Sequence, residues 1–292
     1  MLLREKMQSI RLSNNEKAII DFVLEKEELI KDYTINMIAE ETYTSPSTLI
    51  RVAKKLGFNG WHELKESYLK ELKYLMSHFV DLDANYPFSK NDSIMKIANK
   101  IRQLHTESCQ DTLELLMHDD LQKAIRLIDK CQNLHIFAIG NLCYAGEEFA
   151  YKMNRINKRT YTPTTQSTLF HDAAMLTKKD CAICISYSGE TADMIETVRY
   201  LKQNNVPIIA ITSLGDNSLS NVADVVLRIS TREKSVSKIA AYVSLESISL
   251  ILDILYSCYF SLKYDENIDY KLKVAKRVES NRRIDNKIIS EE

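Results

Sequence analysis

The spacing of apolar residues changes near Leu134, and this change limits the possible folds more than any other feature of the chain. Before Leu134, apolar residues recur every three or four positions, as they do in amphipathic helices. After it, short β-branched runs alternate with helical stretches, which indicates βαβ units and a parallel sheet. The sequence therefore predicts an α + α/β chain, in which an all-helical N-terminal domain precedes a five-stranded parallel-sheet α/β/α sandwich.

The expected elements of the second part follow from these runs. Strands are expected at 134–139, 159–162, 181–186, 206–212 and 224–229. Helices are expected at 146–156, 168–176, 191–203 and 218–223, and from about 239 to 262, while helical patterns also cover about 93 to 130. The tail 263–292 mixes charges, and we expect its last part to be solvated or frayed.

Residues 1–76 carry the signals that start and stop helices. Ser13–Glu16 is a capping-box pattern, and Thr34 is placed to cap a second helix. Ser45–Pro46 is a typical pair of N-cap and first helical residue. The polar and aperiodic segment 82–92 is the expected linker to the rest of the chain.

Two short helices separated by about four residues, the second of them basic, form the usual helix-turn-helix that reads DNA. The segment Ser45–Gly57 fits the second helix, because it carries three cations and no acid in a chain whose net charge is −1. Its hydroxyl-rich N-terminal end is the end that meets bases and phosphates in such motifs. The candidate DNA contacts are Ser45, Ser47, Thr48, Arg51, Lys54 and Lys55. The alternative is a surface helix that is basic by coincidence.

The string SYSGET lies between an expected buried strand and an expected helix. Backbone N–H groups and the positive end of a helix dipole bind anions at such a place, and a glycine lets the backbone approach closely. Its residues, Ser186, Tyr187, Ser188, Gly189, Glu190 and Thr191, are candidates for a phosphate loop. The alternative is a plain hydroxyl-capped turn.

A second loop follows the first expected strand and contains Gly140 and Asn141. A dinucleotide fingerprint needs three glycines here, but Ala138 and Cys143 occupy two of the three positions. This argues against a nicotinamide enzyme. Asn141 remains a candidate neighbour of the phosphate loop.

Catalytic groups are the weak part of the pattern. The carboxylate candidates for the loops are Glu147, Glu148 and Glu246, and each is better explained as an exposed or capping residue. No histidine has a ligand-like spacing to another histidine or cysteine, so neither a metal nor a cofactor is expected.

The cysteines and the most apolar stretch fit an ordinary cytoplasmic protein. Cys181 and Cys184 form a C-x-x-C pattern, but they lie in a strand-like run, which favours buried packing over redox or metal chemistry. Segment 239–262 contains Glu246 and Asp253, so we expect a buried amphipathic helix and no membrane span.

Two regions of the chain resemble a known family. Residues 1–76 resemble the N-terminal domain of RpiR/MurR-type transcriptional regulators, and the string SPSTLIRVAKKLGFNGWHELK (45–65) carries the match. Residues 107–262 resemble the sugar isomerase (SIS) domain of the same regulators, through SYSGET, the strand before it and LILDILYSCYF.

The resemblance implies a homodimeric or larger regulator of carbohydrate or amino-sugar metabolism that binds operator DNA and senses a phosphorylated sugar. It implies an order of helix-turn-helix domain 1–77, linker and connecting helix 78–106, SIS domain 107–262 and charged tail 263–292. It also places Ser244 near the effector. Leu142 and Leu245 depart from the family pattern, since polar side chains often stand there.

Two other classes stay open at the level of sequence. The first is a sugar-phosphate isomerase with an appended helical domain, which would need a positioned base and a ring-opening acid. The second is a phosphosugar-binding or scaffold module, which would show no salt-dependent affinity for DNA.

Overall fold

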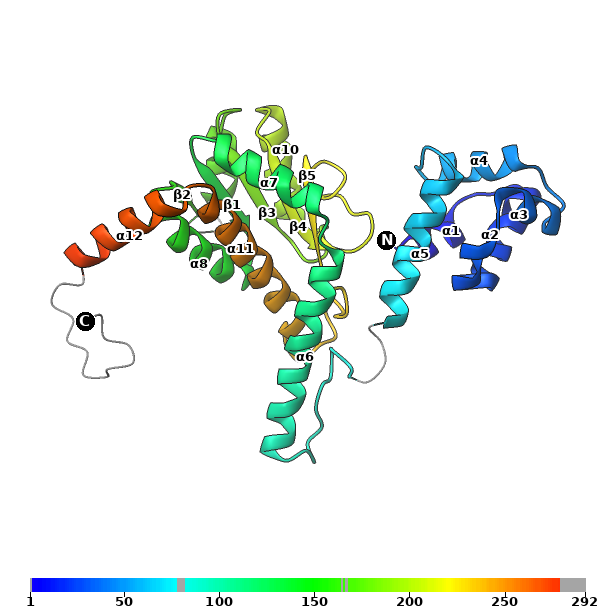
Figure 1. Cartoon of the computed structure of the whole chain (residues 1–292), viewed down its shortest axis with the longest axis horizontal. Helices are drawn as coiled ribbons and strands as arrows, with labels where there is room; N and C mark the ends of the chain where they lie inside the picture. The colour runs from blue at the N-terminus through cyan, green and yellow to red at the C-terminus, as the bar shows by residue number, and fades with distance from the viewer. Residues whose placement is uncertain (1, 78–81, 164, 166–167, 279–292) are drawn as a thin grey trace. The chain divides into compact units, whose positions relative to one another are not determined.

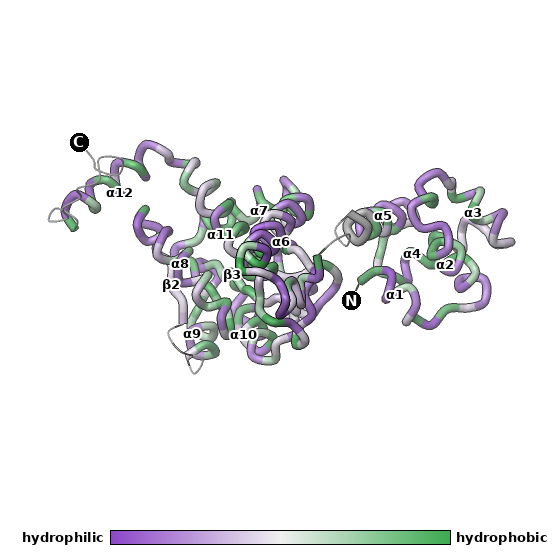
Figure 2. The backbone as a smooth tube through the Cα atoms, turned by 90° about the horizontal axis from the view of Figure 1, so that it is seen from below, coloured by the Kyte–Doolittle hydropathy of each residue, from purple (hydrophilic) through white to green (hydrophobic). Residues whose placement is uncertain are grey.

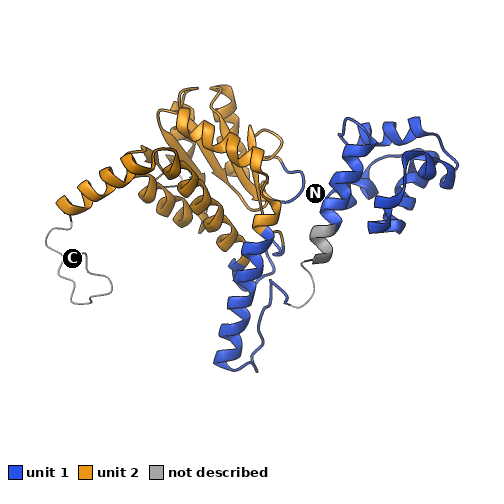
Figure 3. Cartoon of the chain, in the orientation of Figure 1, with its two compact units in different colours: residues 1–111, 214–217, 232–242 blue, residues 112–213, 218–231, 243–292 orange. Residues whose placement is uncertain are grey.

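The computed structural model describes residues 2–77, 82–163, 165 and 168–278. Its contacts divide the chain into two compact units, which are coloured separately in Figure 3. Unit 1 comprises residues 1–111, 214–217 and 232–242, and unit 2 comprises residues 112–213, 218–231 and 243–292. The domain boundaries expected from the sequence remain predictions.

The first part of unit 1 is entirely helical. Its elements are α1 (Leu3–Ser9), α2 (Asn14–Lys26), the 3-10 helix η1 (Glu27–Asp32), α3 (Ile35–Glu41), α4 (Pro46–Lys55) and α5 (Trp61–Ser77). The expected caps are present: Glu16 accepts from the Ser13 N–H, and Thr34 accepts from the Met37 N–H. Ser45 is the N-cap residue of α4 and Pro46 its first residue. The sequence patterns did not single out α1 and η1.

The turn between α3 and α4 contains a residue in the left-handed region of backbone space. Tyr43 has a φ of 50° and is 95% exposed. An L-residue in this conformation costs roughly 1 kcal/mol, because its Cβ crowds the following carbonyl. Gly57, with a φ of 94°, follows the C-cap residue of α4.

The expected linker contacts the segment that follows the last strand. The carbonyl of Asn85 accepts from the Ile239 N–H at 3.0 Å, and its side-chain oxygen accepts from the Lys234 N–H at 2.7 Å. Arg232, which is buried, pairs with Glu107 at 2.6 Å. Segment 82–85 is therefore held in unit 1 by hydrogen bonds to residues far away in sequence.

Within the described part of the chain, unit 2 contains one parallel sheet with strand order β2-β1-β3-β4-β5. The strands are β1 (Leu134–Ala138), β2 (Thr160–Tyr161), β3 (Cys181–Ile185), β4 (Ile208–Ser213) and β5 (Val225–Ile229). The other helices of the chain are α6 (Ile94–Leu115, which begins in unit 1), α7 (His118–Lys130), α8 (Leu142–Asn154), α9 (Leu169–Met175), α10 (Ala192–Gln203), α11 (Tyr242–Leu262) and α12 (Tyr264–Val278).

Helices cover both faces of this sheet, as Figure 1 shows, so the predicted α/β/α sandwich is confirmed. Helices α7, α8 and α11 bury apolar side chains on one face, and α9 and α10 do so on the other. Successive side chains of a strand point to opposite faces. Cys181 and Cys184 are three positions apart, and each is buried in the core on a different face of β3. The expected packing role of the C-x-x-C pattern is confirmed.

One expectation about the helices is wrong, and another can be compared with the structure only in part. Residues 218–223 form turns and not a helix, because these six residues carry no continuous apolar stripe. The charged tail forms helix α12 as far as Val278, and the part expected to be frayed lies beyond the described residues. Figure 2 shows hydrophilic and hydrophobic segments alternating along α12.

Among the described residues, α11 is the one helix that is long and apolar enough to cross a membrane by length and composition. Its side chains Ile248, Ile251, Leu252 and Leu255 are buried against the sheet. This is the arrangement of a core helix, as the sequence predicts.

The short edge strand β2 has its outer backbone groups covered by a side chain. The Leu134 N–H donates to the Arg159 carbonyl, so the backbone groups of Thr160 point away from β1. The amide of Asn154 bonds both of them: its nitrogen donates to the Thr160 carbonyl at 2.8 Å, and its oxygen accepts from the Thr160 N–H at 3.1 Å.

Candidate functional site

The loop SYSGET lies between β3 and the first residue of α10, as expected. Gly189 has a φ of 68°, a conformation that a glycine adopts without strain. The Gly189 N–H donates to the Ser186 hydroxyl at 3.2 Å, and the hydroxyls of Ser186 and Thr191 lie 3.2 Å apart. The structure therefore brings Ser186, Gly189 and Thr191 together in one tight turn.

Several backbone N–H groups of this turn point away from internal partners. Those of Ser188, Thr191 and Ala192 make no hydrogen bond to another described residue. Thr191 is the N-cap residue of α10, and its side chain does not cap the helix. Free N–H groups at a helix N-terminus, together with hydroxyls, form the usual binding geometry for a phosphate.

The carboxylate of Glu190 is engaged within unit 2. It accepts from the N–H of Ser218 at 2.8 Å and from the Ser218 hydroxyl at 2.7 Å. These hydrogen bonds lower the pKa of Glu190, so the carboxylate stays ionised and does not take up a proton near neutral pH. Glu190 therefore braces the turn against the β4–β5 connection.

The loop after β1 lies at the same edge of the sheet, because Ala138 pairs with Ile185 in the β1–β3 ladder. It leads into a cavity of about 220 Å³. The cavity is lined by Ala138, Ile139, Gly140, Cys143, Glu147, Pro163, Thr165 and Leu169. Gly140 has a φ of 67°, Asn141 is exposed as the N-cap residue of α8, and Leu142 packs against the core.

The remaining effector candidates lie at different depths. Tyr187 is half-buried, and its carbonyl accepts from the Ser213 N–H at 3.1 Å. Ser244 is buried in the first turn of α11, and Leu245 packs against the core. Their contact with an effector remains a prediction.

The candidate DNA-binding face is on α4 of unit 1. Ser45, Ser47, Arg51 and Lys54 are exposed on it. Thr48 is only 6% exposed, and its hydroxyl lies 3.0 Å from that of Ser45. Thr48 thus lies beneath the exposed side chains.

The last cation of α4 is paired within unit 1. The Lys55 ammonium donates to Glu16 at 2.7 Å and lowers the pKa of that carboxyl to about 2, together with the Ser13 backbone N–H. Lys55 still exposes 43% of its side chain. The pair ties the end of α4 to the start of α2.

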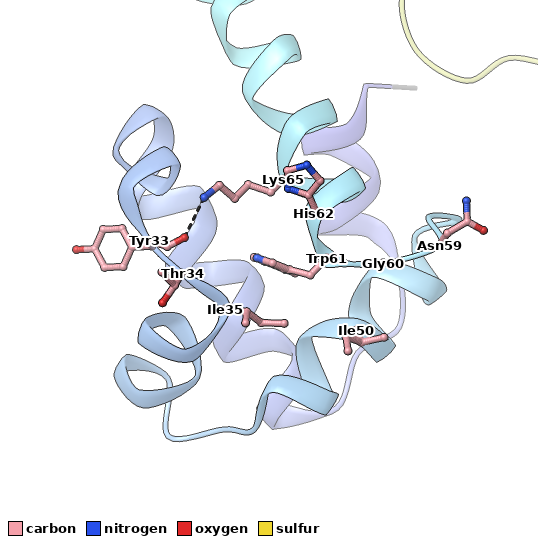
Figure 4. A pocket seen from close by; sticks show the side chains of 9 residues that line it. All are labelled: Tyr33, Thr34, Ile35, Ile50, Asn59, Gly60, Trp61, His62 and Lys65. Carbon is pink, nitrogen blue, oxygen red and sulfur yellow. Dashed lines mark hydrogen bonds between the residues drawn. The ribbon is translucent and has the colours of Figure 1, made fainter.

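A hollow of about 500 Å³ lies beside α4 and is drawn in Figure 4. Its lining residues are Tyr33, Thr34, Ile35, Ile50, Asn59, Gly60, Trp61, His62 and Lys65. The Lys65 ammonium donates to the Tyr33 carbonyl at 2.9 Å. The Trp61 indole N–H is buried and has no hydrogen-bond partner among the described residues. The hollow is not part of the effector site.

Comparison with protein families decides the identity of both parts. Residues 1–73 match the model of the helix-turn-helix domain of the rpiR family, and residues 127–257 match that of the SIS domain. This chain belongs to the rpiR-type regulators that carry a SIS domain. The family expected from the sequence is confirmed.

Relatives of this rpiR-type chain are described as HTH-type transcriptional regulators. One from Clostridium perfringens is 25% identical over 92% of this chain and 95% of its own length. One from Bacillus subtilis is 24% identical over 93% of this chain and 94% of its own length. The architecture of the chain is thus that of a transcriptional regulator with a phosphosugar-binding type of domain.

Solved structures share the fold of this rpiR-type chain. The Vibrio vulnificus NanR protein complexed with ManNAc-6P has a TM-score of 0.60 at 20% identity, over 97% of this chain and all of that chain. The sugar isomerase domain of an RpiR transcription factor from Sphaerobacter thermophilus has a TM-score of 0.56 at 18% identity, over 62% of this chain and 99% of its own.

Sequence reasoning missed two residues at the SIS-domain loops. Ser218 holds Glu190, and the Leu219 N–H donates to the Gly189 carbonyl at 3.1 Å. They lie almost thirty positions after the loop, in a stretch that the sequence pattern assigns to a helix. The polar residues that directly follow β4, at the edge where ligands bind in such sheets, are the signal that points to them.

Proposed function

We propose that this chain is a DNA-binding transcriptional regulator of carbohydrate or amino-sugar metabolism, and that its SIS domain senses a phosphosugar effector. The observation that carries the proposal is the turn SYSGET, where three hydroxyls lie beside N–H groups of Ser188, Thr191 and Ala192 that bond no other described residue. A helix-turn-helix domain in the same chain supplies the output.

The phosphate of the effector binds at the N-terminus of α10. Gly189 gives the turn its left-handed conformation, and Ser186, Ser188 and Thr191 offer hydroxyl donors. The sugar extends from there toward the 220 Å³ cavity after β1, which lies at the same edge of the sheet. Glu147 lines that cavity and is placed to accept a sugar hydroxyl.

Calorimetric titration of the full chain with a panel of sugar phosphates tests this proposal. ManNAc-6P is the first compound to use, because a solved structure of the same fold contains it. We expect at least one monophosphorylated sugar to bind, and the unphosphorylated sugar to bind far more weakly. If no sugar phosphate binds, the domain has no sensor function.

The DNA contacts are the exposed residues of α4, namely Ser45, Ser47, Arg51 and Lys54, with Lys55 at the end of the helix and Thr48 supporting its start. A homodimer presents two such helices, so the operator is an inverted repeat with half-sites one or more helical turns apart, about 34 Å per turn. Footprinting tests the symmetry, and a footprint without a dyad contradicts a two-fold dimer.

An isomerase is the rival function, since Glu147 supplies one carboxylate at the cavity. Isomerisation needs a base and a ring-opening acid. Glu190 is engaged by Ser218, so it does not complete such a pair. We expect no turnover of fructose, glucose, ribose or glucosamine phosphates. Turnover that is lost in Glu147→Gln or Glu246→Gln would assign the chain to the enzymes.

A further inference from the structure

Ile50 is an exposed apolar residue on α4, the helix that carries the candidate DNA contacts. It is 41% exposed, whereas the apolar residues Leu49, Val52 and Ala53 of the same helix are buried at 0% exposure. Apart from Pro46 at the helix start, the other exposed residues of α4 are polar or charged. Ile50 therefore lies outside the apolar stripe that anchors α4 in the core of unit 1.

The stability of the helix does not explain an isoleucine at this exposed position. A β-branched side chain loses rotamer freedom in a helix, so alanine or a straight-chain residue would stabilise α4 better. The surface next to Ile50 is also partly apolar, because Ile35 and Trp61 line the same 500 Å³ hollow, as Figure 4 shows. The side chain of Ile50 thus belongs to an apolar strip that borders the candidate DNA-binding face.

Ile50 also shares a helix face with three of the candidate DNA contacts. The exposed residues Ser47, Arg51 and Lys54 stand at positions i, i+4 and i+7 of this face. Ile50 stands at position i+3 of the same face and in the first half of α4. The N-terminal residues of a recognition helix are the ones that reach base edges in the major groove. A duplex bound through the polar residues therefore brings a base edge to Ile50.

The chemistry of Ile50 matches one base. Thymine presents an apolar group in the major groove, its C5-methyl, beside the O4 acceptor. The groove edges of adenine and guanine and the amino group of cytosine offer hydrogen-bonding atoms, which an isoleucine would leave without partners. Arg51, the next residue along the helix, carries N–H donors for an acceptor such as O4.

We propose that Ile50 is a specificity-determining residue, whose side chain packs against the C5-methyl group of one thymine in each operator half-site. The inference rests on the proposed DNA-binding function, and it adds which base is read and by which residue. Burial of one methyl group changes the affinity about fourfold, so the two half-sites of a dimer together change it roughly fifteenfold.

The test begins with selection of duplexes from a random-sequence library by the full chain. Each thymine of the selected half-site is then replaced, one position at a time, by deoxyuridine, which pairs with adenine as thymidine does and lacks only the C5-methyl group. We expect one position at which the replacement weakens binding by about fourfold in one half-site and by about fifteenfold in both. If no thymine position responds to the loss of its methyl group, the proposal is wrong.

A double-mutant cycle assigns the methyl contact to Ile50. In Ile50→Ala, the thymine and deoxyuridine duplexes should bind equally at the position that distinguishes them in the wild type. Leu29→Ala is the matched control, because Leu29 is an apolar residue that is 61% exposed on η1, outside α3 and α4. This variant should keep the full difference between the two duplexes. An Ile50→Ala variant that keeps the difference as well would overturn the assignment.

The failure of this inference differs from the failure of the proposed function. If the full chain enriches no duplex from the library, the DNA-binding function is wrong, and the role of Ile50 is wrong with it. If the chain enriches a defined half-site and binds it in a salt-dependent way, but does not distinguish thymine from deoxyuridine there, DNA binding stands and the role of Ile50 alone is wrong.

Discussion

Two helices of this chain, α4 in unit 1 and α10 in unit 2, begin in the same local way but differ in the charges that follow. Each is preceded by a left-handed residue two positions before its N-cap residue: Tyr43 before Ser45, and Gly189 before Thr191. Each start also gathers three Ser or Thr residues. Similar backbone turns therefore serve both candidate anion sites.

The difference lies beyond the first turn. Helix α4 continues with Arg51, Lys54 and Lys55 and no acid, while α10 continues with Asp193 and Glu196. Long exposed cations suit a polyanion that is read over a wide surface, such as DNA. Short hydroxyls and N–H groups suit a single small dianion held at close range. In the two proposed sites, the turn would set where the anion binds, and the next turn of helix would set how large that anion is.

The largest expected effect is the dependence on salt. If two α4 helices neutralise about six phosphates, DNA affinity falls with a log–log slope of roughly −5, or about a thousandfold between 50 and 200 mM salt. Effector affinity should change by less than about tenfold over the same range, because the loop itself carries no cation. Titrations of the chain with DNA and with effector at several salt concentrations measure the two salt dependences. Equal slopes would remove the distinction between the two sites.

The next effect concerns the effector loop. A hydrogen bond to a charged group contributes about 1.5–3 kcal/mol, so Ser188→Ala should weaken effector binding by roughly tenfold to a hundredfold. Its affinity for DNA in the absence of effector should not change. Ser257→Ala on α11 is the matched control. Unchanged calorimetric affinity in Ser188→Ala would mean that the effector does not use this loop.

A similar but smaller effect is expected on the DNA side. Arg51→Ala should weaken operator binding by about tenfold and reduce the salt slope by about two, one phosphate for each helix of a dimer. Lys17→Ala, which changes an exposed residue of α2, is the control for a general change in charge. Gel shifts at several salt concentrations measure the affinity and its dependence on salt. An unchanged salt slope in Arg51→Ala would show that Arg51 does not contact the DNA.

The shared turn itself supports a paired test. Tyr43→Gly should stabilise the helical part of unit 1 by about 1 kcal/mol, because glycine adopts the left-handed conformation freely. Gly189→Ala should destabilise unit 2 by about the same amount and weaken effector binding. Thermal melts of the two variants should shift in opposite directions. Shifts of the same sign would show that the two turns are not equivalent.

The smallest expected effect is a change in the stability of unit 1 at low pH. The pKa of Glu16 is lowered to about 2 in the folded protein, so its pairing with Lys55 stabilises unit 1 above about pH 4.5 and is lost as the pH falls toward 2. Glu16→Gln should cost about 1 kcal/mol at neutral pH. The variant should lose less stability than the wild type on acidification. Urea melts at pH 7 and pH 3 measure both values.

The sequence predicted most of the fold because its signals are local. Alternating β-branched runs located all five strands, and the caps Ser13, Thr34 and Ser45 fixed three helix starts. The same local rules located SYSGET and the basic face of α4.

What the sequence missed depends on contacts between distant segments. Ser218 bonds Glu190 across 28 positions. The burial of Thr48 and the pairing of Lys55 likewise follow from packing against other helices. A one-dimensional pattern carries no information about such pairs.

The small edge strand β2 has a consequence for self-association. An uncovered sheet edge invites pairing with a strand of another molecule, and natural proteins protect such edges. Here the edge strand has two residues, and the Asn154 amide occupies the outward N–H and carbonyl of Thr160. A second chain therefore finds no free ladder on that side, so continuous sheet growth and fibre formation stop at β2, and any symmetric contact there is made by side chains.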